Sequence, residues 1–262
     1  MQAMKSLLNK IESIPGAFTL KDKLSSSLIS EVYECTYNQT KAVIRFDLPA
    51  ASKLAIDREN EAIVLNNIFD LGISPSLIYF DPSAGIMIWK YIAGTKPVFD
   101  QEKSNTFSLI DLGRSLACIH SSPIPANSKN IFRDSMNLYE SLLEESQNEM
   151  FFRTASDLYN ELVDDGVKMV FSHNDLHSGN LIWNSKYYFL DWEFSSSNHP
   201  CFDIASLVRS FNLNENQIRF LSKGYQPNDE IFNFDVLQKW ITFIDFLDQI
   251  WEIALTKLSK NL

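Results

Sequence analysis

FSHNDLHSGNLIWNSKYYFLDWEF, residues 171–194, is the stretch that decides how this chain folds around its candidate functional groups. It holds two His, two Asp, one Glu and three Asn around two short apolar runs. The runs LIWN and YYFLD have strand-like composition, and NSK between them is typical of a tight turn. We therefore expect a hairpin that brings Asn180, before its first strand, close to Asp191, after its second.

The two ends of this hairpin carry oxygen ligands of the kind that Mg²⁺ prefers. Asn180 offers an amide carbonyl and Asp191 a carboxylate, both suited to a magnesium ion shared with substrate phosphates. Glu193 could add a second carboxylate, two residues further on. The hairpin therefore predicts a magnesium site that the protein shares with substrate phosphates.

The loop before the hairpin carries a candidate catalytic base. Asp175 precedes Asn180 by five residues, in a loop too short to take it far away. Its carboxylate could accept a proton from an alcohol that approaches a metal-bound nucleotide. We expect His173 to hold the loop by hydrogen bonds, and His177 to face the acceptor molecule.

The rest of the chain divides into two regions of different periodicity. Residues 4–13 predict a short helix, and AFTLKDKL, SEVYECTY and KAVIRFDL predict strands. A helix is expected from Asp57 until Gly72 and Pro75 stop it, and SLIYFDPSAGIMIWKYI predicts a hairpin turned at DPSAG. Gly94 and Pro97 mark a hinge. Beyond the hinge we expect helices over 104–120, 131–149, 152–165, 203–211, 214–224 and 233–258.

Composition excludes several classes of partner. The 262 residues carry a net charge of −10 without a block of Lys or Arg, which argues against nucleic acid and favours small or cationic ligands. No apolar run reaches the roughly 18 residues of a membrane span. Cys35, Cys118 and Cys201 lack metal-site spacing and are expected to be reduced packing residues. We therefore expect a cytoplasmic protein without membrane insertion.

The spacing His173-x-Asp175-x4-Asn180, followed by Asp191-x-Glu193, resembles the catalytic and metal loops of kinases that phosphorylate small molecules. This family includes choline, ethanolamine and thiamine kinases and aminoglycoside phosphotransferases. The resemblance implies an α+β, bilobal protein-kinase-like fold that uses ATP and Mg²⁺. Residues 1–93 would form the β-rich nucleotide-binding lobe, and 94–262 the helical lobe. It further implies that Asp175 is the catalytic base and that Asn180 and Asp191 are magnesium ligands.

The likeness extends to the N-terminal region. AVIRF would be the strand whose Arg45 touches the nucleotide phosphates, with Glu61 of DRENEAIVL as its partner and Glu59 as the alternative. Arginine replaces the usual lysine, as it tends to in choline kinases and their bacterial relatives. The chain has no glycine between Gly16 and Gly72, so LSSSLISEVYE occupies the place of the family's glycine-rich phosphate loop. The nucleotide would contact Ser26, Ser27, Trp89, Tyr91 and Ile92.

The acceptor is expected to be a cation. HNDLHSGN, DWEF and CFDIASL look closest to choline, ethanolamine and thiamine kinases, whose acceptors carry a hydroxyethyl group on a cationic body. On the helix WITFIDFLDQIWEIAL, the aromatic residues Phe243, Phe246 and Trp251 could form walls for that cation, although such a stripe is more often core. Asp175, His177, Glu193 and Trp251 are the expected acceptor contacts. Thiamine kinase, aminoglycoside phosphotransferase and a nucleotide-binding pseudokinase stay open as alternatives, as do GTP as donor and the oligomeric state.

Overall fold

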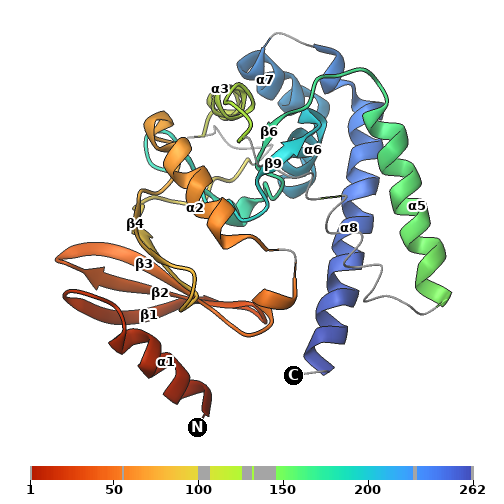
Figure 1. Ribbon diagram of the computed structural model, residues 1–262. Coiled ribbons are helices and arrows are strands. Elements are labelled where there is room, and N and C mark those ends of the chain that lie inside the picture. Colours follow the sequence, from red (N-terminus) through yellow and green to blue (C-terminus); the bar gives the residue numbers. More distant parts are fainter. Residues whose placement is uncertain are drawn as a thin grey trace. The chain divides into compact units, whose positions relative to one another are not determined.

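The computed structural model describes residues 2–54, 56–99, 107–125, 132, 146–226 and 229–260. The chain divides into two compact units, Met1–Ala93 and Gly94–Leu262 (Figure 1). The first unit is built mainly from a β-sheet and the second mainly from helices. The predicted α+β class is confirmed.

The first unit is one antiparallel sheet with two helices. Its strand order is β1-β2-β3-β5-β4, so the hairpin β4–β5 adds its second strand against β3. Helix α2 follows β3, and Asp57 caps it by accepting a hydrogen bond from Asn60 N at 2.9 Å. The elements are α1 (Gln2–Glu12), β1 (Phe18–Ser26), β2 (Ser30–Tyr37), β3 (Thr40–Asp47), η1 (Ala51–Lys53), α2 (Arg58–Asn67), η2 (Phe69–Leu71), β4 (Leu77–Asp81) and β5 (Ile86–Lys90).

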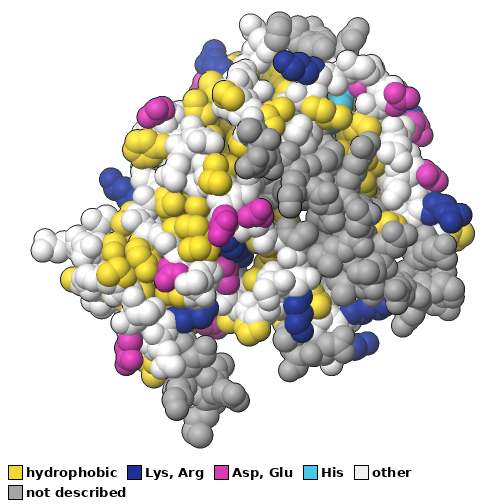
Figure 2. Space-filling model, viewed as in Figure 1, with side chains coloured by type: hydrophobic (Ala, Val, Ile, Leu, Met, Phe, Trp, Pro, Cys, Tyr) yellow, Lys and Arg dark blue, Asp and Glu magenta, His cyan; other side chains and the backbone are white. Residues whose placement is uncertain are grey.

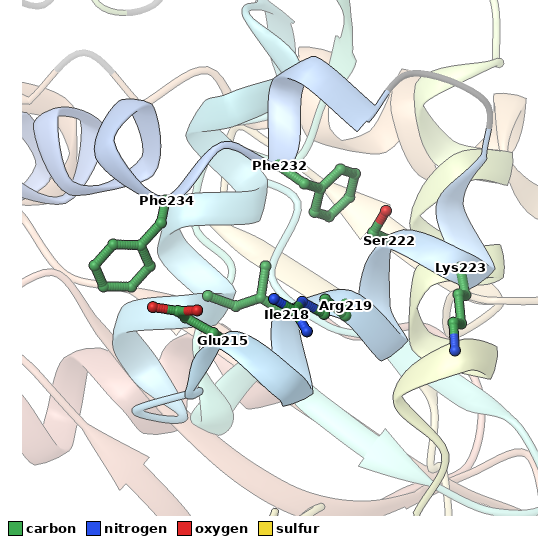
Figure 3. A pocket seen from close by; sticks show the side chains of 7 residues that line it. All are labelled: Glu215, Ile218, Arg219, Ser222, Lys223, Phe232 and Phe234. Carbon is green, nitrogen blue, oxygen red and sulfur yellow. The ribbon is translucent and has the colours of Figure 1, made fainter.

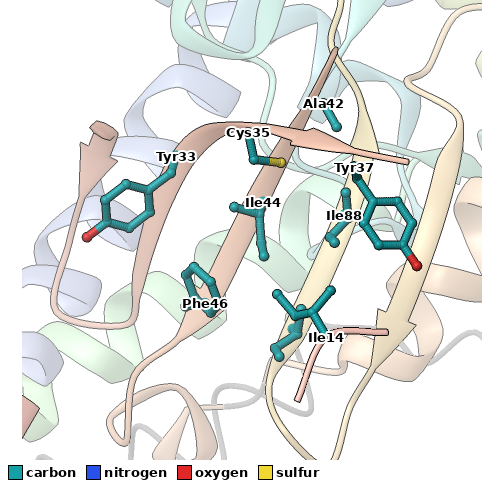
Figure 4. Close-up of a cluster of buried hydrophobic side chains, with 9 residues drawn as sticks. Ile14, Tyr33, Cys35, Tyr37, Ala42, Ile44, Phe46 and Ile88 are labelled. Atoms are coloured by element: carbon teal, nitrogen blue, oxygen red, sulfur yellow. The ribbon is translucent and has the colours of Figure 1, made fainter. Parts of the chain in front are cut away.

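Alternation along β3 separates the core of this unit from its candidate functional side chain. Ala42, Ile44 and Phe46 point to one face, where they form a hydrophobic cluster with residues of β2, β5 and the α1–β1 connection (Figure 4). Because successive side chains of a strand point to opposite faces, Arg45 lies on the other face. The rest of the cluster is Ile14, Tyr33, Cys35, Tyr37, Ile86 and Ile88.

The second unit packs its helices around two short β-ribbons. The ribbon β6–β9 and the hairpin β7–β8 are both antiparallel. Helix α8, the dark blue helix of Figure 1, packs along both α5 and α6. The elements are α3 (Leu109–His120), α5 (Ser146–Val163), β6 (Val170–Ser172), η3 (Ser178–Asn180), β7 (Leu181–Trp183), β8 (Tyr187–Phe189), β9 (Ser196–Asn198), α6 (Pro200–Ser210), α7 (Glu215–Tyr225), η4 (Asp229–Phe232) and α8 (Phe234–Lys260).

Several predicted helix boundaries are wrong, and capping residues explain two of them. Helix α3 begins at Leu109 because Ser108 accepts a hydrogen bond from Asp111 N at 3.1 Å; residues 104–106 lie outside the described residues. Helix α6 begins at Pro200, since His199 accepts from Cys201 N at 3.2 Å. Most of the predicted helix 131–149 also lies outside the described residues. Residues 146–149 instead belong to α5, which continues without the expected break.

The expectation that Phe243 walls a cation site is wrong. Its side chain is fully buried, with its ring centroid 5.3 Å from Tyr159 and 5.9 Å from Trp240. It therefore belongs to the core between α5, α6 and α8. Phe246 is partly buried and contacts Phe151 at 5.0 Å, so it too packs against α5.

The surface carries both signs of charge. Figure 2 shows acidic and basic side chains interspersed among the described residues of the face in view. Within the described part of the chain, no helix is both long and apolar enough to cross a membrane. All three cysteines are free thiols, with Cys35 and Cys201 buried. Cys118 is exposed, so the expectation that it packs in the core is wrong.

Candidate active site

The predicted hairpin is present and has the predicted connectivity. Leu181 pairs with Phe189 and Trp183 with Tyr187, and the turn closes by a 2.9 Å hydrogen bond from Asn184 N to Lys186 O. Below the strands, Leu190 N donates to Asn180 O at 2.9 Å. This bond ties the backbone of Asn180 to the residue that immediately precedes Asp191.

Asn180 is held by Asp175. Its Nδ2 donates to Asp175 Oδ2 at 2.8 Å and to the Asp175 carbonyl at 3.0 Å. Because both partners are acceptors, the amide nitrogen must face Asp175, which leaves Oδ1 directed elsewhere. The side chain of Asn180 is therefore oriented with its oxygen available to a cation.

The DWE segment that follows the hairpin is anchored by its tryptophan. Trp192 is almost fully buried and donates from Nε1 to Phe189 O at 2.9 Å. On either side of it, Asp191 is exposed with a φ of 61°, and Glu193 is buried. A left-handed backbone is tolerated by Asp better than by most residues, because its short polar side chain can interact locally.

These oxygens suit a divalent ion that is shared with phosphates. Asn180 Oδ1 and the carboxylates of Asp191 and Glu193 are hard donors, the type that Mg²⁺ takes from proteins. Among the described residues, no cluster of three His, Cys, Asp or Glu side chains is arranged to hold a metal alone. Mg²⁺ usually takes only one or two protein carboxylates and fills the rest of its shell with phosphates and water.

Asp175 lies in an electrostatic environment that favours its protonated form. Although 35% of the side chain's surface stays exposed, the surrounding protein atoms desolvate the carboxyl. This desolvation raises the pKa of Asp175 well above its usual value. The negative charges of Asp191 and Glu193 raise it further, while the hydrogen bond from Asn180 acts in the opposite direction. The result is a carboxylate with increased proton affinity.

His173 is placed to hold the loop. It is completely buried, and burial lowers its pKa to about 4, so the imidazole is neutral near pH 7. Its Nε2–H donates to Leu190 O at 2.9 Å, and its ring packs 4.5 Å from Trp192. These contacts connect the candidate catalytic loop, residues 173–180, to the DWE segment, as expected of a loop-holding residue.

His177 lies beside Asp175 at the exposed end of the loop. Its Nδ1 accepts from Gly179 N at 3.0 Å, and its Nε2 is 3.8 Å from Asp175 Oδ2. Burial and the nearby charge of Lys96 lower its pKa, while Asp248 acts in the opposite direction. The neutral ring is half-exposed, so it can meet an incoming molecule.

The backbone of the catalytic loop is fixed from helix α6. Asp203 Oδ2 accepts from His173 N at 2.8 Å, and Oδ1 accepts from Asn174 N at 2.9 Å. Asn174 has a φ of 65° and donates from Nδ2 to Phe194 O at 2.9 Å and to Ser196 Oγ at 2.8 Å. Sequence reasoning missed Asn174; its signal is an Asn, which tolerates positive φ, directly before the candidate base.

In the first unit, Arg45 pairs with Glu61. Its Nη1 donates to Glu61 Oε1 at 3.0 Å, and its Nη2 donates to Oε2. Glu59 is exposed, so of the two candidates Glu61 is the partner. Arg58 also binds Glu61, at 3.1 Å, and Asp47, at 2.9 Å. Sequence reasoning missed these two members of the network.

Burial alone would raise the pKa of Glu61, but the charges and hydrogen bonds of Arg45 and then Arg58 outweigh it. The pKa of Glu61 is therefore lowered, and the carboxylate stays ionised. The guanidinium carbon of Arg45 also lies 5.7 Å from the ring centroid of Trp89. Its orientation is thus set by neighbours on both β5 and α2.

The other predicted nucleotide contacts are less closely grouped. Ser26 and Ser27 are exposed at the β1–β2 turn, where Ser27 Oγ accepts from Ile29 N at 3.2 Å and from Ser30 N at 3.1 Å. The hydroxyl of Ser27 is thus used to shape the turn. Tyr91 makes a cation–π contact with Lys41, whose Nζ is 3.7 Å from the ring centroid. Ile92 is partly buried.

On α8, Trp251 meets the DWE segment. Its ring is perpendicular to that of Phe194, with centroids 5.7 Å apart. One turn earlier on the same helix, Asp248 pairs with Arg209 at 2.6 Å, and Asp245 pairs with the same guanidinium at 2.8 Å. The segment next to Glu193 is therefore bordered by aromatic rings and by a helix that carries exposed carboxylates.

A pocket of ≈490 Å³ lies elsewhere in the second unit (Figure 3). It is formed by α7, η4 and the start of α8, and none of the predicted site residues lines it. Its size alone does not make it the catalytic centre. The lining residues are Glu215, Ile218, Arg219, Ser222, Lys223, Phe232 and Phe234.

Comparison with known proteins decides the family. The model of the phosphotransferase enzyme family matches residues 23–240, which include both the Arg45 network and the catalytic loop. The chain belongs to the phosphotransferase enzyme family. This phosphotransferase is therefore an enzyme of the small-molecule kinase type, as the resemblance implied.

Relatives of this phosphotransferase include named kinases. Protein LicA of Haemophilus influenzae is 27% identical over 237 residues, covering 84% of this chain and 86% of that protein. A probable ethanolamine kinase of Arabidopsis thaliana is 26% identical over 254 residues, covering 86% of this chain and 65% of that protein. The crystal structure of choline kinase LicA from Streptococcus pneumoniae superposes with a TM-score of 0.79 at 22% identity, covering 98% of this chain and 92% of that one. This last likeness confirms the kinase fold.

Proposed function

We propose that this phosphotransferase transfers the terminal phosphoryl group of ATP, with Mg²⁺, to the hydroxyl of a small cationic alcohol. Choline and ethanolamine are the first candidates. The observation that carries the proposal is the hydrogen bond between Asp175 and Asn180, in a loop whose backbone is fixed by Asp203. Family membership and the names of the relatives support the same reaction.

Asp175 would act as the general base. Its raised pKa gives the ionised carboxylate a higher affinity for the proton that the acceptor hydroxyl must lose. Asn180 holds that carboxylate in place, and His173 holds the loop. The neutral His177 would border the approaching alcohol.

Asn180, Asp191 and Glu193 would hold the magnesium ion. When bound, Mg²⁺ neutralises negative charge on the nucleotide phosphates and orients them. The protein's part is to present the three oxygens: the hairpin fixes Asn180, and buried Trp192 fixes the residues beside it. In the first unit, Arg45 would bind nucleotide phosphate, oriented by Glu61. Ser26, Ser27, Trp89, Tyr91 and Ile92 stay proposed nucleotide contacts.

The acceptor's cation would lie against Trp251 and Phe194. A quaternary or primary ammonium over an aromatic face gains about 0.5–1 kcal/mol when exposed and about 2 kcal/mol when desolvated. Asp248, on the same helix as Trp251, acts electrostatically on both Asp175 and His177 and adds negative charge to this region. The combination suits choline or ethanolamine, with thiamine as a larger cation of the same type.

Aminoglycoside phosphorylation is the second candidate. The structure of a spectinomycin phosphotransferase with ADP and spectinomycin superposes with a TM-score of 0.58, lower than that of the choline kinase. An aminoglycoside is polycationic, so it would also be attracted by this carboxylate-rich region. The pseudokinase alternative is set aside because the family is one of enzymes. An ATP-dependent reaction and three free cysteines favour the cytoplasm.

A coupled ADP-release assay separates these acceptors. Choline, ethanolamine, thiamine and an aminoglycoside panel would each be tested with Mg-ATP and with Mg-GTP. We expect the highest kcat/KM with choline or ethanolamine. A Trp251→Ala variant should raise KM for that acceptor and leave KM for ATP unchanged. Turnover of aminoglycosides with none of choline or ethanolamine would overturn the assignment.

A further inference from the structure

We propose that Tyr225 and His120 are positioning residues that hold the catalytic loop through Asp203. The inference rests on the proposed role of Asp175 as base, and it extends the active site to helices α3 and α7. Neither residue touches the reacting groups. Their effect passes through a continuous series of hydrogen bonds that ends at the backbone of the loop.

The buried carboxylate of Asp203 is the centre of this series. It is completely buried on α6 and accepts three hydrogen bonds. Two come from the backbone amides of His173 and Asn174, and the third comes from His120 Nε2 at 3.1 Å. Burial would raise the pKa of Asp203, but His120 and the loop backbone outweigh it, so the pKa is lowered. The carboxylate therefore stays charged and depends on these donors.

His120 has its orientation fixed by Tyr225. Because a carboxylate can only accept, His120 Nε2 is the donor to Asp203, and Nδ1 is the ring nitrogen left to bind Tyr225. The hydroxyl of Tyr225 lies 2.7 Å from Nδ1, within hydrogen-bond distance. The two rings also meet edge to face, with centroids 5.4 Å apart. Both side chains are buried, so solvent does not replace either bond.

The helices that carry this pair are packed unusually closely. A Cβ atom at Gly113 of α3 would collide with the carbonyl of Leu221, and one at Gly224 of α7 would collide with the carbonyl of Ile110. The two glycines therefore let the backbones of α3 and α7 touch. This contact lies next to Tyr225 on α7 and fixes the separation of the two helices that Tyr225 and His120 bridge.

The consequence is that α7 sets the geometry of the candidate base. Without the Tyr225 hydroxyl, His120 can rotate, and Asp203 then loses the donor that restrains it. The loop amides shift with Asp203, and Asp175 follows two residues after the first of them. Because only the placement of the base changes, the loss should appear in kcat more than in KM.

The first test compares Tyr225→Phe with Ser206→Ala. Ser206 lies on α6, one turn after Asp203. Among the described residues its buried hydroxyl bonds only within that helix, to Phe202 O at 2.9 Å. Both variants lose one buried hydroxyl. We expect Tyr225→Phe to lower kcat roughly two- to tenfold, the worth of one neutral hydrogen bond, with KM for ATP unchanged. Ser206→Ala should keep the parent kcat. Equal kcat in the parent and Tyr225→Phe would overturn the proposal.

The second test does not depend on turnover. Hydrogen–deuterium exchange of the peptide that contains His173 and Asn174 should accelerate in Tyr225→Phe and not in Ser206→Ala. His120→Gln, whose amide nitrogen can replace Nε2 as donor to Asp203, should stay closer to the parent than His120→Ala in this exchange. If the parent phosphorylated none of the tested acceptors, the proposed function would be wrong. The exchange measurement would still show whether Tyr225 and His120 hold the loop. Unchanged exchange in both Tyr225→Phe and His120→Ala would overturn it.

Discussion

Asp175 meets two demands that oppose each other. Desolvation and the negative charges of Asp191 and Glu193 increase the proton affinity of Asp175, and a general base needs a high proton affinity. The same surroundings make the ionised form costly in the folded protein. A residue that is good for catalysis is therefore expected to be unfavourable for stability.

The first prediction concerns turnover. Asp175→Ala should lower kcat by about 100-fold or more, because general-base assistance contributes on that order. Affinity for nucleotide should stay near that of the parent, since phosphate binding is assigned to other residues. Steady-state kinetics in the ADP-release assay, with nucleotide titration by calorimetry, measure both quantities. Equal kcat in variant and parent would remove Asp175 from the role of base.

The second prediction concerns stability and pH. Because the pKa of Asp175 is raised on folding, the folded protein binds this proton more tightly than the unfolded chain does. Ionisation therefore lowers the free energy of unfolding as the pH rises from the ordinary aspartate value through the raised folded value. Asp175→Asn, which cannot ionise, should be as stable as the parent or more stable at pH 7–8. The advantage should vanish at low pH.

Thermal denaturation of parent and Asp175→Asn across this pH range tests the sign. The amide that replaces the Asp175 carboxyl keeps an oxygen that can accept from Asn180 Nδ2. The variant therefore removes the charge and keeps this hydrogen bond. A variant that loses more stability at pH 8 than at low pH would show that the carboxylate is stabilised by its surroundings.

Contacts that depend on spacing could be predicted at this scale, such as the one between Asp175 and Asn180. The short loop brings the side chains of Asp175 and Asn180 together, and the hairpin brings the backbone of Leu190 to that of Asn180. Asn174 and Tyr225 could not be predicted in the same way. Their partners come from β9 and α3, and only the folded chain brings those elements to the loop.

At the scale of elements, a buried ionic network joins β3 to α2. Arg45 and Glu61 are 4% and 2% exposed, and Arg58 and Asp47 complete the network. Removal of one member of a buried pair leaves an uncompensated charge, which costs far more than the net worth of the pair. The network therefore fixes α2 against the sheet as well as orienting Arg45.

The third prediction follows from this network. Glu61→Gln should lower the free energy of unfolding by about 3–5 kcal/mol at neutral pH and raise KM for ATP. Glu59→Gln, on the exposed face of the same helix, should change the free energy of unfolding by less than about 0.5 kcal/mol. Urea denaturation and nucleotide kinetics measure both variants. An equally small decrease in the free energy of unfolding of Glu61→Gln and Glu59→Gln would show that the network does not stabilise the fold.

The pH dependence of this network has the opposite sign to that of Asp175. The pKa of Glu61 is lowered on folding, so its stabilisation is present above the ordinary glutamate value. It is lost as the pH falls through the lowered value. The parent and Glu61→Gln should therefore converge in stability at acid pH.

Element boundaries were the part of the fold that the sequence predicted least well. The change from strand to helical periodicity predicts the β-rich and helical units, because each pattern buries its apolar face only in one kind of element. Helix ends depend on single side-chain bonds, such as those from Ser108 and His199. Phe243 shows a second limit of prediction from sequence. Its position on the helix does not indicate whether another helix, here α5, covers its side chain.

At the scale of the whole molecule, ligand binding should be visible as stability. A ligand that binds only the folded state adds RT ln(1 + [L]/Kd), about 2.7 kcal/mol at one hundred times Kd. The fourth prediction is that Mg-ATP raises the thermal midpoint more than ATP with a chelator does. In Asp191→Ala the magnesium-dependent part should disappear. A magnesium-dependent part of the same size in Asp191→Ala and in the parent would remove Asp191 from the metal site.

The three cysteines also differ in a way that an experimenter can use. Burial raises the pKa of Cys35 to about 11 and that of Cys201 to about 12, so these thiols should resist alkylation in the native state. Cys118 is exposed on α3, two residues before His120. A maleimide dye would therefore label the unmodified protein at one position, and its emission would report on α3 while the enzyme is working.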